Sequence, residues 1–278
     1  MPESETPPTR AENLARLRSL RGVVVPLVTP VDENGKVDED SVARLLESLH
    51  GNVAGFMPAL SSGEGWKLSL AQWMDMVRYT VRYARGLPVL AGAELGYAPL
   101  IAGRSELAAS LGADAVVVPP PFGNTEDAGL GFVDHVRAIE RDADLPIFLY
   151  CENAVSDWTL DADALAGACA LPSVVGVKES SNDEEFTREA LDRGIEVPVF
   201  QGWEHLLTKV PGTAGFIGSL ANLEPGACRE ALADPTPERQ RTVDDLSERY
   251  RLDADDWYAH LKKELAARGV ISTDRPVD

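Results

Sequence analysis

A lysine stands at the end of a short apolar run near the middle of the chain. The run is 174–177 (VVGV), and Lys178 follows it directly. A lysine that emerges from an apolar strand is poorly solvated, which lowers the pKa of its ammonium group and frees the amine to attack a ketone. The pattern therefore predicts a lysine that forms a Schiff base. The alternative is a lysine that only forms an ion pair with Glu179 or with another acid nearby.

A tyrosine ends another apolar run, 146–150 (PIFLY), and Cys151 and Glu152 follow it. A phenol beside an imine can carry protons between the reacting groups, provided that the nearby cation lowers the pKa of the phenol. Tyr150 is thus a candidate proton shuttle, and Glu152 is a candidate contact to the substrate. The alternative for Tyr150 is a core aromatic residue whose hydroxyl binds the backbone.

Two serines, Ser61 and Ser62, precede Gly63 and Glu64 after a third apolar run. Hydroxyls together with exposed backbone N–H groups make an uncharged site for a small anion, such as the carboxylate of a 2-oxo acid. The alternative is a capping turn in which Glu64 closes a capping box.

All three places lie at the ends of predicted strands. From Gly22 onward, apolar runs without polar alternation are separated by longer segments of helical period, which is typical of a parallel sheet covered on both faces. We predict eight strands, at 23–28, 55–59, 88–91, 115–118, 146–150, 174–177, 198–201 and 215–217. We predict eight helices between and after them, at 40–49, 70–85, 99–111, 130–142, 161–170, 182–193, 204–209 and 225–233.

Eight strand–helix units, with no GxGxxG after the first strand, predict an α/β protein with a closed (β/α)8 TIM barrel rather than a doubly wound sheet. In such a barrel the carboxyl ends of the strands carry the active site, which would bring the three places together. We assign residues 1–20 to a loosely held polar arm with a short helix at 11–20, and residues 21–233 to the catalytic barrel. Residues 234–278 form a C-terminal extension of helices, which we expect to serve as a helical cap or packing element and not as a separate functional domain.

The chain is acidic, with a formal net charge of −19 over 278 residues, of which 44% are hydrophobic. This charge argues against binding to nucleic acid or to an anionic membrane surface, so a substrate carboxylate needs local donors inside a pocket. No apolar stretch is long enough to span a membrane, and the N-terminus lacks a secretory signal, so we expect a cytoplasmic protein. Cys151, Cys169 and Cys228 have no metal-ligand spacing, and we expect reduced thiols and no metal site.

In their order along the chain, the segments of residues 22–233 resemble the family of dihydrodipicolinate synthase and N-acetylneuraminate lyase, class I aldolases and dehydratases of the pyruvate type. The matching motifs are 26–30 (PLVTP), 34–38 (NGKVD), 61–64 (SSGE, in place of the family's TTGE), 112–115 (GADA), 119–120 (PP), 145–150 (LPIFLY), 176–179 (GVKE) and 215–222 (GFIGSLAN). The resemblance implies that Lys178 forms the imine, that Tyr150 is the proton shuttle, and that Ser61 and Ser62 hold the carboxylate. It also implies catalysis without a metal or an organic cofactor, and a homotetramer or homodimer.

Two residues depart from the synthase branch of this family. Phe122 stands where that branch has a tyrosine that reaches across a subunit interface and completes a hydroxyl relay, and Val155 stands where it has an arginine for the second substrate. Phe122 would then line the substrate site without passing a proton. The chain therefore does not resemble a typical dihydrodipicolinate synthase.

Residues after the last two strands look closer to the sialic acid lyase branch. Glu204, His205 and Ser219 are predicted to contact distal hydroxyl or amino groups, and Trp203 is predicted to shape the pocket. We expect a lyase that cleaves or dehydrates a hydroxylated 2-oxo acid, with an aldehyde as the other reaction partner in an aldol reaction. The alternatives are a condensing enzyme of a specialised biosynthetic pathway, and a catalytically silent homologue that binds a small acid or acts as a scaffold.

Overall fold

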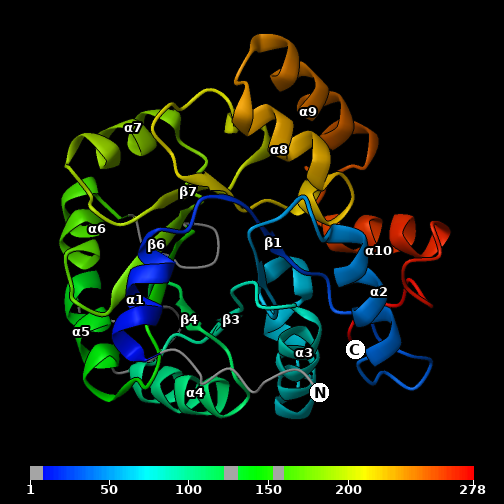
Figure 1. Ribbon diagram of the computed structural model, residues 1–278, viewed down its shortest axis with the longest axis horizontal. Helices are drawn as coiled ribbons and strands as arrows, with labels where there is room; N and C mark the ends of the chain where they lie inside the picture. Colours follow the sequence, from blue (N-terminus) through cyan, green and yellow to red (C-terminus); the bar gives the residue numbers. More distant parts are fainter. Residues whose placement is uncertain (1–8, 122–130, 153–159) are drawn as a thin grey trace.

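The computed structural model describes residues 9–121, 131–152 and 160–278 (Figure 1). Eight parallel strands form its centre: β1 (Gly22–Pro26), β2 (Gly55–Met57), β3 (Leu90–Gly92), β4 (Ala115–Val118), β5 (Ile147–Cys151), β6 (Val174–Glu179), β7 (Val199–Gln201) and β8 (Gly215–Phe216). They form one sheet in the order β2-β1-β8-β7-β6-β5-β4-β3. The end strands β2 and β3 meet at a parallel bridge between Phe56 and Val89, so the sheet closes into a barrel.

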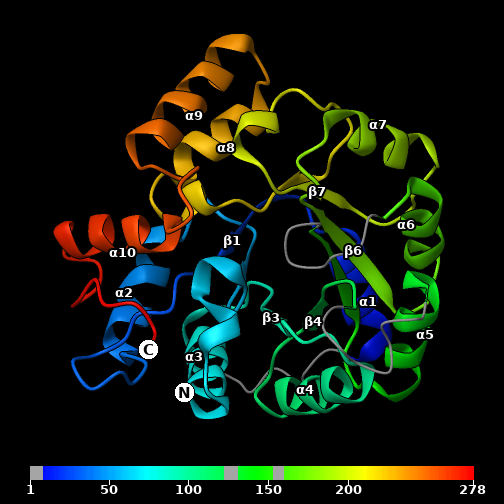
Figure 2. The same ribbon diagram turned by 180° about the vertical axis from the view of Figure 1, so that it is seen from behind.

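Helices surround the strands in both views of the molecule (Figures 1 and 2). They are α2 (Glu39–Leu49), α3 (Leu70–Tyr83), α4 (Ala98–Ser110), α5 (Phe132–Asp142), α6 (Ala162–Cys169), α7 (Glu184–Asp192) and α8 (Pro225–Ala233). The predicted (β/α)8 TIM barrel is thereby confirmed. The helix predicted at 204–209 is wrong, because only the short 3-10 helix η4 (Glu204–Leu206) forms there before Pro211 and Gly212 interrupt the chain.

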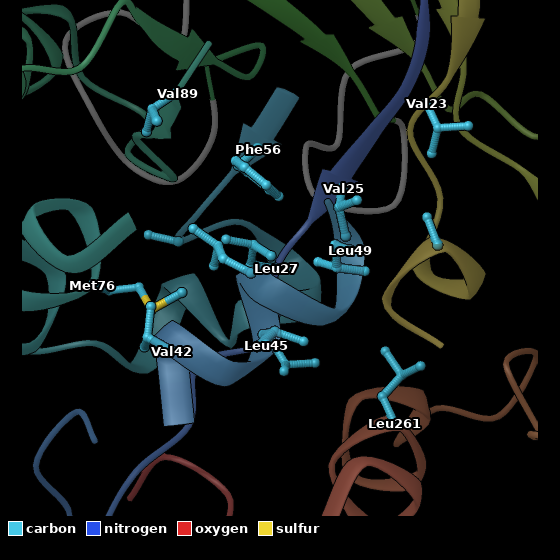
Figure 3. Packing of buried hydrophobic residues seen from close by; sticks show 14 of the residues in the cluster. Val23, Val25, Leu27, Val42, Leu45, Leu49, Phe56, Met76, Val89 and Leu261 are labelled. Carbon is cyan, nitrogen blue, oxygen red and sulfur yellow. The ribbon is translucent and has the colours of Figure 1, made fainter. Parts of the chain in front are cut away.

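One hydrophobic cluster joins the barrel wall to its outer helices (Figure 3). Val25 of β1 and Phe56 of β2 are fully buried, and they share this cluster with Leu45 and Leu49 of α2 and Met76 of α3. The apolar side chains follow the helical period on α2 and α3, which explains why these segments form helices against the sheet. This packing fixes β1 and β2. The turn that contains Ser61 and Ser62, called the serine turn below, follows β2 along the chain.

Helix α1 (Arg10–Arg18) covers the amino-terminal end of the barrel. Leu17 is fully buried, and it belongs to the same cluster as the residues inside the barrel. The guanidinium of Arg18 donates to the carbonyls of Pro172 (2.8 Å) and Val174 (3.1 Å), and the Asn13 amide donates to the carbonyl of Asp114 (2.8 Å). The expectation of a loosely held arm is therefore wrong for residues 9–20, because this helix plugs the barrel.

The C-terminal helices α9 (Pro237–Arg249) and α10 (Trp257–Ala267) pack on the barrel, and the tail after them returns to the serine turn. Lys262 of α10 is fully buried and forms an ion pair with the buried Glu64. The ammonium of Lys262 also donates to the carbonyl of Arg275 (2.9 Å), and the amide of Val277 donates to Glu64 Oε2 (2.8 Å). Glu64 thus anchors the C-terminal tail, and the capping-box alternative for it is wrong. Among the described residues, no helix combines the length and apolar content that a membrane crossing needs.

Candidate active site

The register of two neighbouring strands brings Lys178 and Tyr150 together. Tyr150 of β5 pairs directly with Lys178 of β6, and paired residues of adjacent strands point to the same face of a sheet. Both residues are buried: Lys178 is 5% exposed and Tyr150 is 2% exposed. The Lys178 Nζ atom lies 4.3 Å from the centre of the Tyr150 ring. Two residues before the lysine, a Cβ atom on Gly176 would come within 2.5 Å of the Phe148 ring, so glycine is required beneath Lys178.

Burial lowers the pKa of Lys178. The carboxylates of Glu152, Glu204 and Glu94 act in the opposite direction but do not cancel the desolvation. Glu179 does not pair with this lysine, since its carboxylate accepts from the Ser181 amide (2.6 Å) and from the Thr187 hydroxyl (2.5 Å). Within the described ranges, Lys178 has no ion pair shorter than 4 Å. The alternative of a lysine paired with Glu179 is therefore wrong.

The hydroxyl of Tyr150 lies between two polar side chains. It is 3.3 Å from the Ser61 Oγ atom, and it donates to Glu152 Oε2 at 3.3 Å. Burial, followed by the negative charges of Glu152 and Glu94, raises the pKa of Tyr150 well above its usual range. The expectation of a lowered phenol pKa is wrong, because desolvation outweighs the nearby lysine. Tyr150 is thus a neutral phenol that can accept one proton while it donates its own.

The two serines occupy the short 3-10 helix η1 (Ser61–Gly63), directly after β2. The Ser62 hydroxyl is 3.0 Å from the hydroxyl of Ser219, which begins the 3-10 helix η5 (Ser219–Asn222) after β8. A Cβ atom on Gly63 would come within 2.7 Å of the Leu27 carbonyl, so the turn packs closely on the end of β1. The carboxyl ends of β2 and β8 therefore meet through these hydroxyls.

These side chains line one cavity of about 300 Å³ at the carboxyl ends of the strands. Eight of the ten predicted site residues line it, and Phe122 lies outside the described residues, as does Val155. The eight are Ser61, Ser62, Tyr150, Glu152, Lys178, Trp203, Glu204 and Ser219. His205 does not line the cavity, and its ring packs against Trp203, which does line it (centroids 5.8 Å apart). A larger hollow of about 510 Å³ beside α6 and α7 contains none of the predicted residues.

Glu204 lines the cavity and also forms hydrogen bonds that stabilise the surrounding structure. Its buried carboxylate accepts from the amide of Leu220 at 2.9 Å, and its backbone carbonyl accepts from the Gln240 side chain at 2.9 Å. Burial raises the pKa of Glu204, and the backbone hydrogen bonds and Lys178 partly oppose this. The residue therefore fixes η5 while it places negative charge beside the lysine.

Glu94, two residues after β3, is a buried acid that the sequence analysis missed; it does not line the cavity, but its charge acts on Lys178 and Tyr150. The backbone amides of Ser61 and Trp66 and the charge of Lys178 act to lower the pKa of its carboxyl group, and its shielded Oε1 atom has no hydrogen-bond partner among the described residues. Burial raises the pKa of Glu94 to about 7, although Lys178 opposes the shift. An acid directly after a barrel strand was the available signal, because active-site groups gather at such ends.

Residues of the cavity wall were also missed. Ser180 follows the catalytic strand β6, is 2% exposed and lines the cavity, and its Oγ atom has no hydrogen-bond partner within the described ranges. The segment between α9 and α10 supplies Leu252, Asp253, Ala254 and Asp255 to the same cavity, and the first residue of α10 supplies Trp257. A helical cap or packing element was expected of the C-terminal helices, but no local pattern could have shown which of their residues line the cavity. The described residues contain no group of three His, Cys, Asp or Glu side chains that could hold a metal ion.

Comparison with known proteins gives the same family throughout. Residues 19–272 match the family model described as the dihydrodipicolinate synthetase family. A 4-hydroxy-tetrahydrodipicolinate synthase of Xanthomonas axonopodis pv. citri (strain 306) is 32% identical over 93% of this chain and 83% of the relative. An uncharacterised DapA-like lyase of Halobacterium salinarum is 30% identical over 90% of this chain and 85% of the relative.

The fold has close counterparts among solved structures. The dihydrodipicolinate synthase of Acinetobacter baumannii, solved in complex with pyruvate, superimposes with a TM-score of 0.82 at 23% identity and covers 93% of this chain and 92% of its own. This similarity concerns the fold, whereas the family model and the sequence relatives identify the family. The chain therefore belongs to the dihydrodipicolinate synthetase family, whose members are class I aldolase-type lyases and synthases.

Proposed function

We propose that this enzyme forms a Schiff base between Lys178 and the ketone of a hydroxylated 2-oxo acid, which it then cleaves as a lyase. The observation that carries the proposal is the buried lysine beside Tyr150, in one cavity with Ser61 and Ser62. Burial lowers the pKa of Lys178, so a larger fraction of the amine is uncharged and nucleophilic.

The chemistry balances with the groups in the cavity. The uncharged Lys178 amine adds to the ketone carbon, and uptake of one proton with loss of water gives a protonated imine. The C4 hydroxyl of the substrate then loses its proton, the C3–C4 bond breaks, and its electron pair moves to the imine nitrogen, which leaves an enamine and an aldehyde. Protonation of the enamine at C3 and hydrolysis of the imine release pyruvate and the free lysine.

Tyr150 and Glu152 suit the proton transfer in this cleavage. The phenol donates to Glu152 at 3.3 Å, so it can take the proton of the substrate hydroxyl while it passes its own to the carboxylate. This relay needs no phenolate, which agrees with the raised pKa of Tyr150. The hydroxyls of Ser61 and Ser62 are the proposed donors to the substrate carboxylate, since they line the same cavity.

Pyruvate release from a 4-hydroxy-2-oxo acid tests this function. The wild-type protein should release pyruvate and an aldehyde, and Lys178→Ala should abolish the release. Lys263→Ala is the matched control, because Lys263 is exposed on α10 and should leave the rate unchanged. Absence of turnover with every 2-oxo acid in both directions would favour the silent homologue, and turnover only with added aldehyde would favour the condensing enzyme. Sedimentation of the purified protein tests the proposed homotetramer or homodimer.

A further inference from the structure

The cavity wall contains four acidic side chains and one basic side chain among the described residues. Glu152 and Glu204 lie along its inner wall, and Asp253 and Asp255 face it from the segment between α9 and α10. Among the described residues that line the cavity, Lys178 is the one basic side chain. No described lining residue is an arginine, which is the side chain best suited to bind a second carboxylate.

The charges do not balance once a simple 2-oxo acid is bound. A protonated imine carries one positive charge, and the carboxylate of the same substrate carries one negative charge. The substrate therefore offers nothing to offset the acids of the wall. Asp253 and Asp255 are exposed, and neither forms an ion pair with another described residue. A second carboxylate on the substrate would be repelled, whereas a cation would be attracted.

Aromatic side chains line the same cavity. Trp203 and Trp257 both line the cavity, and aromatic faces attract ammonium and guanidinium groups. The Trp203 indole N–H donates to the Ser180 carbonyl at 3.0 Å, which holds this ring in place. The shape and charge of the wall thus favour the same kind of ligand.

A buried hydroxyl in the wall also lacks a partner. Ser180 lines the cavity, is 2% exposed, and its Oγ atom has no hydrogen-bond partner within the described ranges. A buried polar atom without a partner is costly, so a ligand that bonds to it gains affinity. The hydroxyl can accept from an N–H group of a ligand. This observation is independent of the acidic residues.

We infer that the distal end of the substrate carries a positive charge, as an ammonium or guanidinium group. The inference rests on the proposed function, because the 2-oxo acid end is bound as the imine of Lys178. Asp253, Asp255 and Glu152 then attract the cation, the two tryptophans contact it, and Ser180 accepts from it. The product released with pyruvate is an aldehyde that bears this cation.

A matched set of substrates tests the charge alone. Three 4-hydroxy-2-oxo acids of equal length end in a guanidino group, in a ureido group and in a carboxylate. The first two have nearly the same size and shape and differ by one charge. The measured quantity is kcat/KM for pyruvate release by the full-length protein. We expect the guanidino substrate to exceed the ureido substrate by about tenfold or more, and the carboxylate substrate to be the poorest.

Substitution of two aspartates that line the cavity provides a second test of the inference. The double variant Asp253→Asn with Asp255→Asn should lower the guanidino-to-ureido ratio about fivefold or more, chiefly through KM. Asp192→Asn is the matched control, since Asp192 is exposed on α7 and does not line the cavity. It should leave the ratio unchanged.

The outcomes separate the two claims. If borohydride traps a 2-oxo acid on Lys178 but the ureido or carboxylate substrate equals the guanidino substrate, the inference about charge is wrong and the proposed function stands. An unchanged ratio in the double aspartate variant would also overturn the inference. If no 2-oxo acid is trapped on Lys178, both claims fail.

Discussion

The substitution Glu94→Gln tests whether ionisation of the buried Glu94 carboxyl group lowers the free energy of unfolding at neutral pH. Burial raises the pKa of Glu94 from its usual value of 4.5 to about 7. A carboxyl with a raised pKa in the folded state binds its proton more tightly there than in the unfolded chain. The contribution of Glu94 to stability is therefore most favourable at low pH and is lost as the pH rises through its folded pKa.

The size of the effect follows from the two pKa values. A change from 4.5 to about 7 makes ionisation of Glu94 cost the folded state about 3 kcal/mol at a pH of about 8, and about 1 kcal/mol at a pH of about 5. Glutamine has nearly the same shape but cannot ionise. The stability advantage of the variant over the wild type should thus grow by about 2 kcal/mol between these two pH values.

Urea unfolding of both proteins at the two pH values measures this difference, because titrating groups that do not interact with Glu94 cancel in the comparison. Asp192→Asn serves as the control for removal of an acid that is exposed on α7. The reasoning is refuted if Glu94→Gln is equally stable relative to the wild type at both pH values, or if its advantage is larger at the lower pH.

Two further substitutions test the site and its support. Tyr150→Phe keeps the ring beside Lys178 but removes the hydroxyl, so kcat for pyruvate release should fall about 10²- to 10⁴-fold while borohydride trapping persists; an unchanged kcat would exclude Tyr150 from the proton relay. Lys262→Met leaves the buried Glu64 carboxylate with only the longer ion pair to Lys67 (3.6 Å), so the free energy of unfolding in urea should fall by about 3 kcal/mol. Arg85→Met breaks the exposed ion pair with Glu47 and should lower the free energy of unfolding by less than about 1 kcal/mol. Equal losses for these two variants would contradict the role of Glu64 and Lys262 in anchoring the C-terminal tail.

Much of the fold follows from local patterns in the sequence. Apolar runs without alternation predict buried parallel strands, and β4 has the predicted bounds of 115–118. Other strands begin or end one or two residues from the prediction, because their ends depend on hydrogen bonds to neighbouring strands. Lys178, Tyr150 and Ser61 were predictable because each stands at the carboxyl end of a strand run.

The rest of the site depends on distant contacts that leave no local pattern. Trp257 and Asp253 reach the cavity only because the C-terminal helices fold back over the barrel mouth. The phenol pKa of Tyr150 was predicted in the wrong direction, since the completeness of its burial is a property of the folded chain. The expected arm at the N-terminus packs as α1 for the same reason, because the plug it forms is visible only once the barrel has closed.

The central claim is that Lys178 forms an imine with a 2-oxo acid. Incubation of the full-length protein with pyruvate and borohydride, followed by intact mass measurement and peptide mapping, tests it most directly. One reduced pyruvate adduct per chain, located on Lys178 and absent in Lys178→Met, is the predicted result. An unmodified chain, or an adduct on another lysine such as Lys262, would contradict the account.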